Sequence, residues 1–255
     1  MHRGFTYVIL GFRGNYRKKM MQTIKFTDTI GVPKEYCPVP ASKIIPEWYK
    51  NLESYIGEEK KPNGTGGTNI TAKRCMPIFD AITSGYIILT HTDLWVSQRP
   101  DENGKMQPAY EWPNFGALGH HAKEQLPDHP DGAGHEFIYP KWRNAWAIAT
   151  PPGYSTLFIS PLHRETPIMV FPGVVDTDTY NAPVNFPFVL RDSKMDGLIP
   201  AGTPIMQVIP FKREEWQMEI GGAKELQEQE NMINRIRSVF FDSYKKQFRQ
   251  PKEYK

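Results

Sequence analysis

The sequence has little cysteine, no long apolar run and no large excess of either charge, and each absence excludes a class of protein. Cys37 and Cys75 are the only cysteines among 255 residues. Two cysteines are too few for a disulfide framework, and their spacing matches no metal motif, so we expect a reducing compartment, the cytoplasm. No apolar run approaches the ~18 residues of a membrane helix, so we expect no membrane partner.

The charge pattern also excludes a strongly basic nucleic-acid binder. The formal net charge is +3, with 31 basic against 28 acidic residues. Five of the basic residues lie in the acid-free stretch 1–20, and the remainder carries 26 against 28, a balance of −2. That balance leaves no electrostatic footprint for nucleic acid. We interpret residues 1–20 as a basic tail or an upstream start, because Met20 and Met21 offer a second beginning.

What the sequence does contain is turn residues and short apolar runs. Glycine and proline number 20 and 23, and aromatics make up 13% of the chain, which favours a mainly β protein. Between Pro151 and Arg213 the pattern predicts four strands, at Ser155–Ile159, Ile168–Phe171, Phe186–Leu190 and Ile205–Phe211. Further strands are expected at Met21–Ile30, Gly85–Val96, Ala145–Ala149 and Glu215–Ile220. We expect a single β domain over residues 21–220.

Helices are expected near both ends of this domain. Pro46 and the spacing of Trp48, Leu52 and Tyr55 predict a short N-terminal helix, and a helical turn is expected at Cys75–Ala81. Apolar residues recur at helical spacing from Ala223 to Gln247, with acids in the first turns and bases in the last. We predict one C-terminal amphipathic helix within 221–247, covering the domain or a neighbouring subunit, and a tail at 248–255.

Two segments raise the question of a metal site. Residues 98–136 are polar, lack a period and hold His120, His121, His129 and His135, so we expect a long loop insertion whose histidines cluster by chance rather than bind metal. His91-Thr92-Asp93 lies on an expected strand. Together with His163 it matches the ligand types of the facial triad of Fe(II) oxygenases. A strand-end polar turn remains the alternative interpretation for His91 and Asp93.

Four short motifs follow one another through the chain: Thr83–Ile87, Thr150–Tyr154 with Phe158–Pro161, Pro172–Asp178, and Ile199–Ile209. In this order they resemble the motifs of the dUTPase and dCTP-deaminase superfamily, together covering about half the chain. The resemblance implies a β-clip fold, a distorted β-barrel, and a homotrimer, since trimers are common in that family. The rest of the chain loosely resembles uncharacterised proteins of tailed phages, including those of cyanobacteria, which implies host cytoplasm or the virion as the location.

The resemblance also implies a set of site residues. Asp176 matches the aspartate that activates the attacking water while a triphosphate and its Mg²⁺ are held alongside. Ligand-binding roles are implied for Tyr154, Ser160, His163, Arg164, Asp178, Tyr180 and Gln207. Three positions depart from the family pattern: Ile87 replaces an acid, Leu162-His163-Arg164 replaces the Arg-Ser phosphate grip, and Tyr180 falls one residue late.

Three hypotheses of function follow. The first is a noncatalytic β-clip protein, a phage accessory or virion component without a cofactor, in which Asp176 and Asp178 cap a turn. The second is a divergent Mg²⁺-dependent nucleoside triphosphate hydrolase, with Asp176 as base and Arg164 on phosphate. The third is an Fe(II)/2-oxoglutarate-type oxygenase that uses His91, Asp93 and His163.

Overall fold

The computed structural model describes most of the chain beyond residue 20. The described residues are 21–57, 60, 69–113, 116–127, 129–130, 138–237 and 242–255. The predicted basic tail 1–20 and His135 therefore lie outside the described residues. The prediction of a mainly β protein is confirmed, because the described strands form four sheets and every pairing between them is antiparallel.

The largest sheet has five strands in the order β11-β9-β14-β3-β2. These strands are β2 Val39–Pro40, β3 Tyr86–Leu89, β9 Tyr154–Ile159, β11 Gly173–Val175 and β14 Pro204–Lys212. A second sheet has the order β10-β12-β7-β6, and consists of β6 Leu118–Ala122, β7 Ile138–Trp142, β10 Ile168–Val170 and β12 Phe186–Leu190. The four strands predicted between Pro151 and Arg213 are thus confirmed, and they divide equally between these two sheets.

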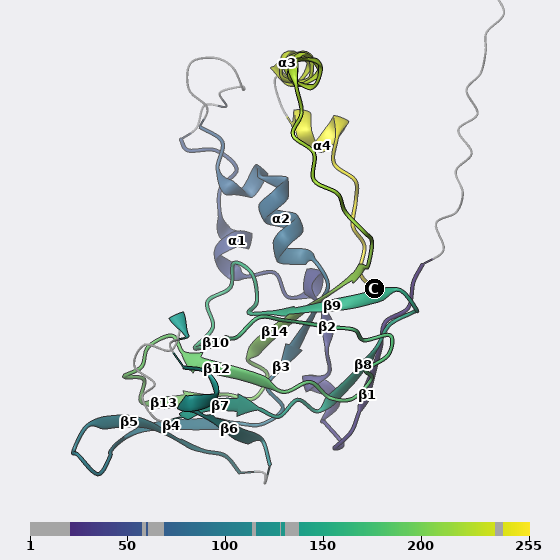
Figure 1. The fold of residues 1–255 in the computed structure, drawn as a ribbon. Helices are drawn as coiled ribbons and strands as arrows, with labels where there is room; N and C mark the ends of the chain where they lie inside the picture. The colour runs from purple at the N-terminus through teal and green to yellow at the C-terminus, as the bar shows by residue number, and fades with distance from the viewer. Residues whose placement is uncertain are drawn as a thin grey trace, which may run out of the picture.

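Two smaller sheets complete the β domain. One has the order β13-β4-β5, from β4 Leu94–Pro100, β5 Met106–Glu111 and β13 Gly197–Ile199, and the other pairs β1 Lys25–Asp28 with β8 Trp146–Ala149. None of the four sheets closes into a barrel among the described strands. The finer prediction of a distorted β-barrel is therefore not confirmed for this part of the chain, which forms open sheets layered on one another (Figure 1).

A single core holds the layers together. Phe158, Met206 and Val208 from the five-stranded sheet are at most 2% exposed and belong to the same cluster as Trp142 and Phe186 from the four-stranded sheet. All but Trp142 come from the short apolar runs bounded by turn residues on which the strand predictions rest. The core between the two larger sheets is also where a cavity opens, as described below.

Helices lie above one end of the sheets (Figure 1). They are α1 Glu47–Asn51, α2 Met76–Thr83, α3 Ala223–Arg237 and α4 Ser243–Gln247, with short 3-10 turns at Lys34–Tyr36, Ala41–Lys43, Ala72–Arg74 and Lys123–Gln125. The helices predicted near Trp48 and at Cys75–Ala81 are confirmed as α1 and α2. In the described part of the chain, no helix has the length and apolarity needed to cross a bilayer.

Gly85, between α2 and β3, determines how closely the chain approaches the neighbouring strand β14. Gly85 joins α2 to β3 with a φ of +68°, and a Cβ at this position would lie 2.0 Å from the Val208 carbonyl oxygen. A side chain cannot be accommodated at that distance, and the left-handed backbone conformation independently favours glycine. Gly85 therefore allows β3 to approach β14 closely, directly beneath α2.

The prediction for residues 98–136 is wrong in part. Rather than an irregular loop, the segment contains the end of β4, all of β5 and β6, and a short 3-10 turn. Residues 106–111 are exposed or half-buried along the whole strand, so their side chains show no hydrophobic alternation, and backbone pairing with β4 holds β5 in place. A strand without a buried face gives no period-2 signal.

The C-terminal region also differs from the prediction. Residues 215–220 form no strand, and the single predicted helix is two helices, α3 and α4. Asp242 directly precedes α4 with a φ of +58°, a left-handed conformation that a continuous α-helix cannot contain. The predicted tail is anchored, because Arg249 and Lys252 both bind the carboxylate of Asp80 on α2, at 2.7 and 3.0 Å.

Candidate functional site

The acidic bend Asp176–Tyr180, which follows β11, is anchored to the core by a buried threonine. Thr177 is 1% exposed, and its hydroxyl lies 2.7 Å from that of Thr150 and 2.8 Å from that of Thr156. The backbone N–H of Tyr180 donates to the Asp176 carbonyl at 2.8 Å and closes the turn. This inward anchor turns the flanking side chains of Asp176 and Asp178 toward the surface.

Arg213, directly after β14, binds both carboxylates of the bend. Its Nη1 lies 3.2 Å from Asp176 Oδ1 and 2.9 Å from Asp178 Oδ1, and its Nη2 donates to Asp178 Oδ2. Asp176 also accepts a 2.6 Å hydrogen bond from the Ser155 hydroxyl. The Asp178 side chain is 6% exposed, whereas that of Asp176 is 62% exposed. The bend is therefore a surface ion cluster in which one acid is covered and the other faces solvent.

The electrostatics of this ion cluster follow from its hydrogen bonds. Arg213, aided by the backbone N–H of Gly153 at 2.8 Å, lowers the pKa of Asp178 to about 2. Asp178 in turn raises the pKa of Arg213. A charged pair with several mutual hydrogen bonds favours the ionised form of both partners. The sequence alone predicts no role for Arg213. Its one sequence feature is its position directly after the last apolar strand, which becomes β14 and pairs with β9.

Arg164, the predicted phosphate ligand, lies elsewhere and has another use. Its guanidinium donates to the backbone carbonyls of Ile44, Ala41 and Ile82. Burial lowers its pKa to about 10. The side chain therefore joins the segment after β9 to α2 and to the 3-10 turn that precedes α1, and no hydrogen bond connects it to Asp176 among the described contacts. The predicted role of Arg164 on phosphate is not supported by its position.

Gln207 has a similar internal role. The side chain is fully buried, its Oε1 accepts from the backbone N–H of Leu162 at 2.8 Å, and its Nε2 donates to the carbonyls of Ala81 and Ser84. All three contacts tie β14 to segments that flank α2. Ser160 is likewise internal, since its hydroxyl exchanges hydrogen bonds with the backbone of Val170 on β10. Two more predicted ligand residues thus hold the fold together.

The remaining predicted residues are dispersed. His163 adopts a φ of +53°, and its carbonyl accepts a 2.8 Å hydrogen bond from the Trp48 indole. Tyr180 is 52% exposed. Tyr154 lines a separate cavity of about 740 Å³ between β1, β9 and the C-terminal segment, whose walls include Tyr254. The structure therefore groups the side chains of Asp176 and Asp178 with Arg213. Tyr154 and Tyr180 join them only through backbone hydrogen bonds, from Arg213 to the Tyr154 carbonyl and from the Tyr180 N–H to the Asp176 carbonyl.

The predicted facial triad is not assembled. His91 packs edge-on against Trp142 with ring centroids 5.0 Å apart, and burial lowers its pKa while the nearby Asp28 opposes that shift. Asp93 accepts a 2.8 Å hydrogen bond from the backbone N–H of Ala201. Across the described ranges, no group of three His, Cys, Asp or Glu side chains is placed to hold a metal ion. Asp93 instead serves the alternative role of a polar turn at a strand end.

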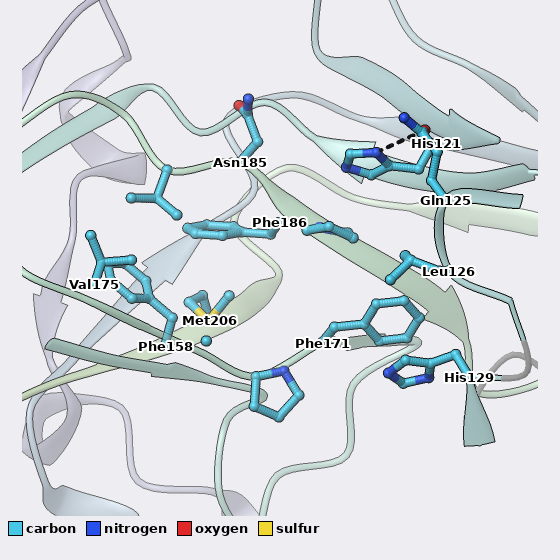
Figure 2. Close-up of a pocket in the computed structure, with 14 residues that line it drawn as sticks. His121, Gln125, Leu126, His129, Phe158, Phe171, Val175, Asn185, Phe186 and Met206 are labelled. Carbon is cyan, nitrogen blue, oxygen red and sulfur yellow. Dashed lines mark hydrogen bonds between the residues drawn. The ribbon is translucent and has the colours of Figure 1, made fainter. Parts of the chain in front are cut away.

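An aromatic cavity of about 550 Å³ lies between the two larger sheets. Figure 2 shows Phe158 and Val175 on one side of it, Phe171 and His129 on the other, and Phe186 between them. The floor is apolar, because Phe158, Phe186 and Met206 belong to the core. Its volume falls within the ~300–1,000 Å³ that is usual for small-molecule sites. Sequence analysis missed this cavity because its walls come from five strands of two sheets.

The polar side chains of the cavity are amides and imidazoles. His129 stacks on Phe171 with ring centroids 4.0 Å apart, and His121 Nδ1 lies 3.2 Å from Gln125 Oε1 (Figure 2). Asn185 lines the cavity as well, whereas no Asp, Glu, Lys or Arg is among the described residues that line it. The cavity can therefore form hydrogen bonds with a ligand without presenting a carboxylate, ammonium or guanidinium group to it.

Comparison with known proteins gives no indication of function. No protein-family model matches the chain, and no curated protein is significantly similar to it in sequence.

Proposed function

We propose that this chain is a noncatalytic binding protein with a divergent dUTPase-like β-clip fold, and that it holds a neutral, planar ligand in the aromatic cavity. The observation that carries the proposal is the cavity itself, which combines three phenylalanine rings with two imidazoles and two amides and lacks a charged lining side chain among the described residues. Aromatic walls favour a flat ligand, because rings stack or meet edge to face.

The chemistry of the lining argues for a neutral ligand. A charged group moved into an apolar site loses its hydration, and without an opposite charge nearby that loss is not recovered. The His121 imidazole and the amides of Gln125 and Asn185 offer both donors and acceptors, which suit the polar edge of a heterocycle. A free nucleobase or a similar uncharged heterocycle fits these requirements, and a triphosphate does not.

The arrangement of the motifs supports the β-clip assignment. Three segments that resemble the dUTPase superfamily contain β9, β11 and β14, and these strands are neighbours in one sheet. The pairing is antiparallel, with Val174 opposite Leu157 and Val208 opposite Phe158. Segments scattered over about sixty residues of sequence thus meet in one layer, as a shared fold requires. We propose the phage setting on the sequence resemblance alone.

The noncatalytic assignment is supported by where the implied phosphate ligands lie. Arg164 is committed to three backbone carbonyls and Gln207 to three backbone groups. A role on phosphate would require Arg164 to abandon these contacts and leave buried carbonyls without donors, at a cost of about 1–3 kcal/mol for each. The fold therefore opposes the use of Arg164 in catalysis.

Ligand binding can be tested with a matched pair of substitutions on β11. Val175 lines the cavity and its neighbour Val174 is 60% exposed, because successive side chains on a strand point to opposite faces. We expect at least one of a set of neutral heterocycles, such as uracil, thymine, adenine and indole, to raise the melting temperature. At a hundred times its Kd a ligand stabilises by about 2.7 kcal/mol.

Val175→Trp is expected to abolish this shift by filling the cavity, whereas Val174→Trp should retain it. Thermal unfolding of each variant without ligand checks that both fold. The proposal fails if no heterocycle produces a shift, or if Val175→Trp responds as strongly as Val174→Trp.

A second candidate, a Mg²⁺-dependent nucleoside triphosphate hydrolase, is favoured by one observation. Asp176 keeps a solvent-facing carboxylate that could act as a general base on a water molecule. The two carboxylates of the bend share Arg213, so they do not fit as the ligand set of a Mg²⁺ ion. The nucleotide assay at the end of the Discussion distinguishes this candidate from the binding protein.

A further inference from the structure

The segment from Glu214 to Arg237 leaves the β domain and packs little against it. Trp216, Met218 and Ile220 alternate with polar residues, yet they are 87, 86 and 91% exposed. Helix α3 follows and has no buried residue. Figure 1 shows α3 far from the sheets, with α4 as its neighbour. Apolar side chains exposed together in this way indicate an interaction surface.

Helix α3 lacks the packing that a helix of its length normally needs. It has 15 residues, and an isolated helix of about 12–15 residues is only marginally stable in water. Its N-terminus is well formed, since Glu225 Oε2 accepts from the backbone N–H of Gly222 at 2.8 Å. A cap contributes only about 1 kcal/mol, so the apolar face of the helix is expected to pack against a partner.

The apolar stripe of α3 is largely exposed. Leu226, Met232 and Ile233 are 57, 51 and 45% exposed and lie along one stripe at helical spacing, and Ile236 on the same stripe is half-buried. Arg235 lies nine residues beyond Leu226, roughly half a turn around the helix, and its guanidinium is 5.8 Å from the ring of Phe248 beside α4. This contact with Phe248 therefore leaves Leu226, Met232 and Ile233 available to a partner.

The charges of α3 are complementary to those of a second α3 in the reverse direction. Residues 223–230 hold three glutamates and one lysine, a balance of −2, and residues 231–237 hold two arginines, a balance of +2. Antiparallel alignment of two copies places each acidic half beside a basic half, whereas parallel alignment places like charges together. A two-fold symmetric contact requires such a self-complementary surface.

We propose that α3 is the dimerisation element of this protein and packs antiparallel against α3 of a second copy through the stripe of Leu226, Met232, Ile233 and Ile236. The two-fold axis lies near residue 233, so that Ile233 of each copy packs against Ile233 of the other and Glu230 lies level with Arg237. The segment Trp216–Ile220 extends the apolar surface beyond the helix. This contact differs from the homotrimer that the family resemblance implies.

One ion pair makes the direction of packing testable. Glu230 and Arg237 lie seven residues apart, on the same side of the apolar stripe. In the antiparallel pair, Glu230 of each copy faces Arg237 of the other. Glu230→Lys or Arg237→Glu alone brings like charges together, and the double variant restores the attraction with its signs reversed.

The experiment measures the mass of the full chain by sedimentation velocity over a range of micromolar concentrations. We expect a dimer for the wild type and a monomer for Ile233→Glu. The control Asn231→Glu places the same charge on the exposed opposite side of α3 and should leave the dimer intact. Each single charge variant should weaken dimerisation at least tenfold, and the double variant should recover most of that loss.

Because Ile233 is not buried within the chain, its substitution is expected to leave the thermal unfolding of the β domain unchanged, which separates loss of the contact from misfolding. A wild-type monomer, a trimer, a dimer unaffected by Ile233→Glu, or charge variants that fail to rescue one another would each overturn the proposal.

Discussion

Two arginines of this protein have opposite surroundings. Arg164 is half-buried, has no acid as a partner among the described contacts, and donates to the backbone carbonyls of Ala41, Ile44 and Ile82. Arg213 is 39% exposed and binds two carboxylates and the backbone of Tyr154. The first arginine holds elements of the fold together, and the second organises a surface. The comparison shows that the same residue type can be structural or available for ligands, depending on what surrounds it.

The largest loss of stability is expected when Arg164 is replaced. Arg164→Met leaves the carbonyls of Ala41, Ile44 and Ile82 without this donor, and unfolding by urea should show a loss of about 3–4 kcal/mol. The control is Arg191→Met, because Arg191 is exposed and its loss should cost at most about 0.5 kcal/mol. A loss below about 1 kcal/mol for Arg164→Met would mean that the buried contacts contribute little.

A smaller effect is expected at Asp80, which extends the comparison to a covered acid. Its side chain is 9% exposed and binds Arg249 and Lys252. Burial raises the pKa of Asp80, but the hydrogen bonds and charges of the two cations outweigh burial, so the pKa is lower than usual. Asp80→Asn should cost about 2 kcal/mol and release the C-terminal segment. Limited trypsin digestion should then cleave after Arg249 faster than in wild type.

The matched control for Asp80→Asn is Glu253→Gln, since Glu253 is 70% exposed and pairs only weakly with Lys255. Equal cleavage rates in the two variants would show that Asp80 does not anchor the segment.

The pH dependence of Asp178 sharpens the comparison at the surface. Arg213 lowers its pKa to about 2, below the ordinary value of 3.8. The folded state therefore binds fewer protons than the unfolded state, and the stabilisation is present above about pH 4 and lost as the pH falls toward 2. Asp178→Asn should remove this part of the acid sensitivity, measured as denaturant midpoints between pH 5 and 2.

Asp176→Asn is the comparison variant for this titration, because Asp176 is far more exposed and its contact with Arg213 is longer. We expect it to leave the acid sensitivity nearly unchanged. If Asp176→Asn reduced the acid sensitivity more than Asp178→Asn, the assignment of this sensitivity to Asp178 would be wrong.

The sequence predicted the strands that are short apolar runs bounded by turn residues. β9, β12 and β14 contain the buried Phe158, Phe186 and Val208, and such a run is a local property of the sequence. β5 was missed because none of its residues is fully buried and it contains no apolar run, and the break before α4 was missed because neither glycine nor proline marks Asp242. Local patterns therefore predicted the strands with apolar runs and missed β5.

The candidate site was less predictable than the strands because it depends on long-range contacts. The resemblance directed attention to the bend at Asp176 and Asp178, but Arg213 reaches it only through the pairing of β14 with β9. The roles of Arg164 and Gln207 depend on where α2 packs, and the cavity depends on how two sheets are layered. None of these distances is encoded in the spacing of residues along the chain.

The central proposal, that this protein binds a ligand and does not hydrolyse nucleotides, is tested most directly by assaying a panel of nucleoside triphosphates with Mg²⁺ for release of pyrophosphate or phosphate. We predict no turnover above background for wild type, and the same result for Asp176→Ala, whose stability should change by at most about 0.5 kcal/mol. Hydrolysis of any nucleotide by the wild type that Asp176→Ala abolishes would contradict the account.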